Sequence, residues 1–149
     1  MSKRKNAVSA EGAKLLRKVA KHILEEPLRY DQNVIVERAG SNYFSDLTKP
    51  MFPKCGTIAC IGGWIQVLTH KKQKKWDLPS TKKMAKLFGV PESAVDRLFS
   101  GIYATDCYIK SLWPQRFIDA YNNATTPRQR AKVANHVIEH FIKTGFAND

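Results

Sequence analysis

The sequence has no apolar segment long enough to cross a membrane. Its longest apolar stretch runs from Ile58 to Thr69 and is interrupted by Gln66, so it is well short of the ~20 residues that a membrane-spanning helix needs. The basic residues from Lys3 to Lys5 are not followed by the apolar region of a signal peptide. These absences predict a cytoplasmic protein that does not bind or cross a membrane.

Cysteine is scarce, with three residues at Cys55, Cys60 and Cys107. An odd number of cysteines in a chain that can form a core argues against a secreted scaffold held by disulfides. The hydrophobic fraction of 43% is sufficient for such a core. The length of 149 residues suits one domain.

Acidic residues are also scarce. The chain has 13 Asp and Glu against 25 Lys and Arg, which gives a net charge of +12. Half of this charge lies in the stretch from Lys71 to Lys86, which contains seven lysines and the single acid Asp77. A positive field of this size attracts polyanions, so nucleic acid, nucleotides, anionic lipid and acidic proteins are all candidate partners.

Helical spacing of apolar residues and suitable capping residues predict a mainly α-helical fold. We expect a disordered basic tail at residues 1–8 and a single helical domain at residues 9–149. The expected helices are Ser9–Glu26, Thr57–His70, Ser80–Phe88, Pro91–Phe99, one that starts near Pro114, and Thr126–Lys143. The second is apolar almost all round, which predicts a central, buried helix. We also consider a minor β-element near Val34–Val36.

The pair of helices between Thr81 and Ser100 resembles the helix-turn-helix of Cro-type phage repressors. Such a motif needs a small residue in its first helix, glycine at the turn and apolar residues at fixed later positions. The residues that meet these demands are Ala85, Gly89, Val90, Val95 and Leu98.

The second helix of this pair has mixed charge. Arg97 is its only basic residue, and we predict that Arg97 contacts bases if the motif reads DNA. Glu92 and Asp96 on the same helix would repel phosphates. A simple helical hairpin is the alternative interpretation.

Two other segments are candidate anion sites. In the first, Lys71, Lys72, Lys74, Lys75, Lys82 and Lys83 would neutralise phosphates, and Trp76 would stack on a base. In the second, Gly56 and Thr57 would present free backbone N–H groups at the start of the central helix. The alternatives are a solvated loop and an ordinary helix cap.

Enzymatic interpretations have less support. Cys55 precedes a predicted helix start, where the pKa of a thiol can fall, but a Cys–His pair would need His70, His136 or His140 nearby in the fold. The letters His136-x-x-Glu139-His140 match an inverted zinc-protease motif. Only nine residues follow His140, which leaves no room for the downstream ligand. We therefore expect a solvated, partly basic face here, and no metal or cofactor.

The segment from Cys55 to Trp64 resembles a family of short uncharacterised bacterial and phage proteins with the pattern Cys-Gly-Thr-x-x-Cys-Ile-x-Gly-Trp. Later elements of that family are matched here by Leu87–Val90, Arg97–Phe99, Thr126–Ala131 and Thr144–Gly145. The resemblance implies a shared fold and a bacterial or phage source. It implies no activity and no catalytic residue.

Together these patterns predict a non-enzymatic protein that binds an anionic partner, DNA or RNA, through its lysine-rich stretch and the helix-turn-helix at residues 81–100. Two alternatives remain open. One is a phage-type effector that binds a nucleotide signal or a host protein, and the other is a cysteine-dependent enzyme.

Overall fold

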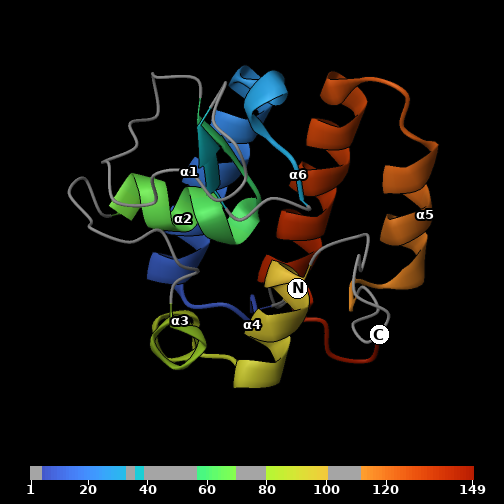
Figure 1. Cartoon of the computed structure of the whole chain (residues 1–149). Helices are drawn as coiled ribbons and strands as arrows, with labels where there is room; N and C mark the ends of the chain where they lie inside the picture. Colours follow the sequence, from blue (N-terminus) through green and yellow to red (C-terminus); the bar gives the residue numbers. More distant parts are fainter. Residues whose placement is uncertain (1–4, 33–35, 39–56, 70–79, 101–111) are drawn as a thin grey trace.

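The computed structural model describes residues 5–32, 36–38, 57–69, 80–100 and 112–149. This part of the chain forms a mainly helical domain, as predicted (Figure 1). Its elements in chain order are α1 (Ala10–Glu25), the 3-10 turn η1 (Pro27–Arg29), β1 (Val36–Arg38), β2 (Thr57–Ala59), α2 (Ile61–Thr69), α3 (Thr81–Phe88), α4 (Glu92–Phe99), α5 (Gln115–Asn123) and α6 (Pro127–Thr144). The two strands pair antiparallel, with Val36 opposite Ala59.

Helix α6 lies between α1 and α5, and the α3–α4 pair packs at one end of this layer (Figure 1). The predicted apolar stripes of α1 and α6 face the core. Their buried members are Leu16, Val19, Ala20 and Ile23 from α1, and Ala134, Val137, Ile138 and Phe141 from α6. Because all six described helices contribute to one cluster of buried side chains, they form a single domain.

Helix α2 is the predicted central helix, but it starts later than expected. Its residues from Ile61 to Val67 are all buried. Thr57 is not a helix cap, because it lies in β2 opposite Arg38. Cys60 takes the capping position instead, and its Sγ accepts the Gly63 N–H at 3.3 Å.

The residues just before Ser9 also belong to the folded domain. The backbone N–H groups of Ala7 and Val8 donate to the carbonyls of Lys143 and Ile142 at 3.2 and 3.1 Å. The side chain of Val8 is 3% exposed and belongs to the core. The prediction of a disordered tail is therefore wrong for these residues, and residues 1–4 lie outside the described part.

Most predicted helix ends are confirmed by their caps. The Ser9 hydroxyl accepts the Gly12 N–H at 3.0 Å and donates to the Leu87 carbonyl at 2.7 Å. Gly89 adopts the left-handed conformation with φ +70°, which favours glycine at the turn after α3. Thr126 and Gln129 form a reciprocal capping box at the start of α6.

A buried glutamine forms hydrogen bonds with parts of the core that are far apart in the sequence. The Oε1 of Gln32 accepts the Tyr30 hydroxyl at 3.1 Å and the Ile61 N–H at 3.3 Å. Its Nε2 donates to the Ser100 carbonyl at 2.9 Å and the Leu98 carbonyl at 3.4 Å. The backbone N–H of Gln32 donates to the Tyr121 hydroxyl at 3.2 Å. One residue thus joins α2, α4 and α5.

We predict that Gln32→Leu destabilises the fold by at least about 2 kcal/mol, because each buried polar group left without a partner costs about 1–3 kcal/mol. The substitution removes the carboxamide, which leaves the Ile61 N–H, the Tyr30 hydroxyl and two backbone carbonyls without this hydrogen-bond partner. Urea unfolding followed by circular dichroism measures this change. Gln115→Leu on the exposed side of α5 is the matched control. Equal midpoints for both variants would contradict a structural role for the network.

Helices α1 and α3 approach closely at Gly12. A Cβ at this position would lie 2.7 Å from Cδ1 and 3.1 Å from Cα of Phe88. The absence of a side chain at Gly12 therefore sets the distance between the two helices.

Gly12→Ala is expected to lower stability although alanine is the better helix former. The gain in helix propensity is about 1 kcal/mol, whereas overpacking costs about 1–3 kcal/mol, and the contact with the Phe88 backbone gives little room for relaxation. Thermal unfolding measures the sum. Lys14→Ala, on the exposed face of the same helix, is the control. A higher melting temperature for Gly12→Ala would show that α3 can move away at little cost.

Candidate functional site

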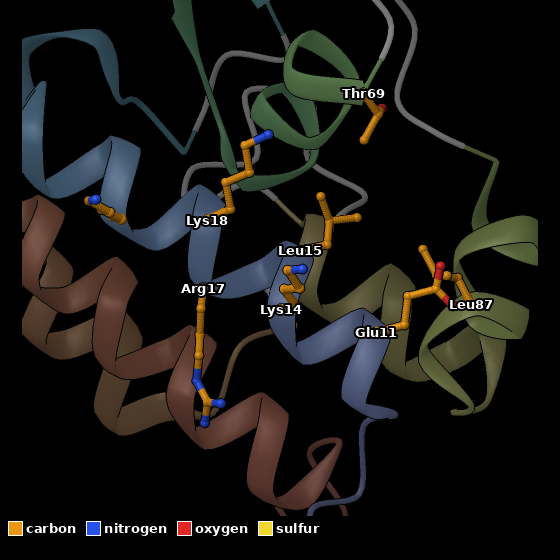
Figure 2. Close-up of a pocket in the computed structure, with 8 residues that line it drawn as sticks. Glu11, Lys14, Leu15, Arg17, Lys18, Thr69 and Leu87 are labelled. Carbon is orange, nitrogen blue, oxygen red and sulfur yellow. The ribbon is translucent and has the colours of Figure 1, made fainter.

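A groove of about 740 Å³ lies on the outer side of α1, where this helix meets the end of α2 and α3 (Figure 2). Most of its surface is apolar. Its lining residues are Glu11, Lys14, Leu15, Arg17, Lys18, Lys21, Thr69 and Leu87. Four cations and one carboxylate therefore surround an apolar hollow, which we call the α1 groove.

The four cations lie on one face of α1 because they follow helical spacing. Arg17 points toward α6 (Figure 2), where its Nε and Nη2 bind both oxygens of Glu139 at 3.0 and 3.4 Å. This carboxylate raises the pKa of Arg17 through its hydrogen bond and its charge. Lys21 pairs more loosely with Glu25 at 3.7 Å. Lys14 and Lys18 form no ion pair with other described residues, so their charge is available to a partner.

Helix α3 adds three exposed lysines, Lys82, Lys83 and Lys86, and contains no acidic residue. Lys83 precedes Leu87 by one helical turn, so the two side chains lie on the same side of α3. The structure therefore places two of the predicted phosphate-binding lysines, Lys82 and Lys83, on an exposed helix that packs against α1.

The rest of the predicted lysine run lies outside the described residues. This applies to Lys71, Lys72, Lys74, Lys75 and Trp76. In the sequence this run begins two residues after Thr69, which lines the groove. Its role stays a prediction.

The segment predicted as a helix-turn-helix forms two packed helices, α3 and α4. Ala85, Val95 and Leu98 are buried, as the pattern requires. The outward residues of α4, however, are Glu92, Ser93 and Asp96, and Asp96 accepts a hydrogen bond from the Thr81 hydroxyl at 3.1 Å. An exposed face with two carboxylates and no lysine is poorly suited to a phosphate backbone.

Arg97 is held within the fold. Its Nε donates to the Leu112 carbonyl at 2.9 Å and its Nη1 to the Phe146 carbonyl at 3.1 Å. The guanidinium carbon also lies 5.0 Å from the centre of the Phe146 ring. These contacts fix α4 to the turn after α6 and do not favour the predicted contact of Arg97 with bases.

We therefore predict that Arg97→Gln lowers stability by about 1–2 kcal/mol, the scale of hydrogen bonds made by a charged donor, and leaves sequence preference for oligonucleotides unchanged. Chemical unfolding and competition binding measure the two effects separately. Arg128→Gln, an exposed residue of α6, is the control for the lost charge. A change of sequence preference at constant stability would restore the interpretation of α4 as a reading helix.

The predicted anion site at Gly56 and Thr57 is not formed as expected. Gly56 lies outside the described residues, and Thr57 belongs to β2. The true start of α2 is buried, and its Ile61 and Gly63 N–H groups bind Gln32 and Cys60. This helix end therefore has internal partners in place of an anion.

The described part of the chain gives little support for a nucleophile or a metal. Burial raises the pKa of the Cys60 thiol to about 11, which disfavours the reactive thiolate. Cys55 lies outside the described residues. No group of three or more His, Cys, Asp or Glu side chains that could hold a metal ion occurs among the residues placed in the structure.

The expected solvated face at the end of α6 is wrong for His140. The Nε2 of His140 lies 2.6 Å from the Asp149 carboxylate, and Arg116 contacts both side chains. Burial acts to raise the pKa of Asp149, but the hydrogen bonds from His140 and Arg116 outweigh it and the pKa is lowered. Glu139 on the same helix pairs with Arg17. The contacts of His140 and Arg116 with Asp149 join α6 and α5 to the last residue. The pair of Glu139 with Arg17 joins α6 to α1.

Leu15 and Leu87 were not predicted as parts of a site. Leu15 lies beside the buried stripe of α1 and Leu87 beside the buried residues of α3, and each is one turn from a lysine, Lys18 or Lys83. An apolar residue at such a boundary is the signal that could have indicated a groove, but only the packing of α1 on α3 brings the two leucines together.

None of the described helices is both long and apolar enough for a membrane span. Comparisons of the chain with protein family models, with curated proteins and with solved structures give no match. The resemblance to short bacterial and phage proteins therefore stays a prediction.

Proposed function

We propose that this protein binds nucleic acid through the exposed lysines of α1 and α3, without catalysing a reaction. The observation that supports the proposal is the set of exposed, unpaired lysines on α1 and α3 in the described part of the chain. Lys14 and Lys18 on α1 and Lys82, Lys83 and Lys86 on α3 are exposed and form no ion pair within the described residues. Their charge is therefore not used by the fold.

The proposed mechanism is electrostatic. Lysine ammonium groups neutralise phosphates and release condensed counterions, which gives affinity without sequence preference. The run from Lys71 to Lys75 follows the groove residue Thr69 in the sequence and would extend the same cationic surface. Trp76 would add stacking on a base. The acidic outer face of α4 would lie away from the phosphates.

The first test removes two charges at a time. We expect Lys82→Gln combined with Lys83→Gln to flatten the log–log dependence of affinity on salt by about 2 units, because each phosphate contact contributes about 0.9 on duplex DNA. The same change at Lys71, Lys72, Lys74 and Lys75 is expected to flatten it by about 3–4 units. Fluorescence anisotropy at several salt concentrations measures the slope.

The control removes the same charge elsewhere. The control variant combines Arg128→Gln with Lys132→Gln. Both residues are exposed at the start of α6, which lies away from α3 (Figure 1). If this control flattens the slope as much as the α3 variant, the attraction comes from net charge alone and no local site exists. Failure of the parent protein to bind any oligonucleotide at low salt would overturn the proposal in favour of a nucleotide or protein partner.

A further inference from the structure

The α1 groove has a feature that phosphate binding does not need. Its hollow is apolar, with Leu15 and Leu87 half-buried and facing it from two helices. Figure 2 shows Leu15 at the centre, with Thr69 above it and Leu87 next to Glu11. Phosphates on the outside of a duplex would contact the cationic rim and leave this apolar surface empty.

We propose that the α1 groove accepts an unstacked base of a single-stranded nucleic acid, while Lys14 and Lys18 hold the phosphates on either side. This inference rests on the proposed function and names its partner class. Single strands can turn their bases outward toward protein side chains, whereas a duplex keeps its bases stacked inside.

The size and the charge of the groove fit this occupant. A volume of about 740 Å³ can take a base with its sugar, since sites for small ligands span about 300–1,000 Å³. Four cations and one carboxylate, Glu11, occur among the described lining residues. Two of the cations, Arg17 and Lys21, form ion pairs with carboxylates outside this set, so Lys14 and Lys18 supply the free positive charge of the groove. Because Glu11 lies beside Leu87 (Figure 2), it disfavours a phosphate at that point of the groove and favours a backbone path along Lys14 and Lys18.

An acidic amphipathic helix is the other macromolecule that such a groove could attract. Helix-in-groove recognition uses a row of apolar anchors over two or more turns. Among the described lining residues, the apolar side chains are those of Leu15 and Leu87, and two such side chains suit one inserted group better than a row of anchors. The observations therefore favour a base.

The test compares strands of equal charge with and without bases. We expect the full chain to bind a single-stranded DNA oligonucleotide about tenfold more tightly than the same oligonucleotide built from abasic residues, the scale of one or two base contacts. Binding to a duplex of the same length is expected to be weaker than binding to the single strand. Fluorescence anisotropy at near-physiological salt measures all three.

A substitution in the hollow sharpens the comparison. Leu15→Gln is expected to weaken binding of the normal strand toward that of the abasic strand, and to leave the abasic strand unchanged. Leu28→Gln is the control, because Leu28 is 78% exposed in η1 and does not line the groove. Circular dichroism checks that both variants fold, and the comparison of strands on the parent protein stands without either variant.

Each outcome separates this inference from the function on which it rests. Equal binding of normal and abasic strands would overturn the base site and leave phosphate binding intact. Failure of every oligonucleotide to bind would overturn both proposals. Binding of an acidic amphipathic peptide that is lost in Leu15→Gln, together with equal binding of both strands, would assign the groove to a protein partner.

Discussion

The buried side chain of Gln32 joins parts of the fold that hydrophobic contact alone would leave free to slide. Apolar packing is not directional, so the stripes of α1 and α6 can be satisfied by more than one arrangement of the shorter helices. The carboxamide of Gln32 accepts from the first residue of α2 and donates to the last turn of α4. A buried polar group without a hydrogen-bond partner is costly. The network of Gln32 therefore favours the placement of α2, α4 and α5 in which each of its polar groups has a partner.

This placement has a consequence for the surface. Helix α2 ends at Thr69 beside the outer face of α1, and α4 holds α3 against the start of α1. The close approach at Gly12 brings the two helices near enough for Leu15 and Leu87 to line one hollow. The groove is therefore made by the core contacts of three helices, while its lysines contribute nothing to the core.

The fold was largely predictable because its helices carry local signals. Ser9, Ser80 and Thr126 cap helices where predicted, and the stripes of α1 and α6 follow helical spacing. The errors occur where distant contacts decide. Thr57 was predicted to cap a helix, but it pairs with Arg38 in the β-sheet. Gln32 lay in a segment with no helical or strand pattern, and nothing local marks its four hydrogen bonds to distant parts of the chain.

The candidate site was predictable in composition but not in shape. The lysines of α3 were expected to be exposed, and they are. Leu15 and Leu87 are 72 positions apart in the sequence, and no periodic pattern connects them. The internal hydrogen bonds of Arg97 were not predicted, because a lone arginine on a helix looks the same in a sequence whether it faces solvent or donates to carbonyls of the same chain.

Arginine and lysine divide the positive charge between structure and surface. Arg17, Arg97 and Arg116 each form several contacts with carboxylates, carbonyls or rings. A planar guanidinium suits such contacts because its donors are fixed in a fork. In the described part of the chain, the lysines of the groove and of α3 have at most the loose pair of Lys21 with Glu25. A lysine ammonium is a point charge on a flexible stem, and it can follow a phosphate backbone of irregular path. Within the described residues, the exposed lysines of α1 and α3 are thus the part of the charge that folding leaves available for a partner.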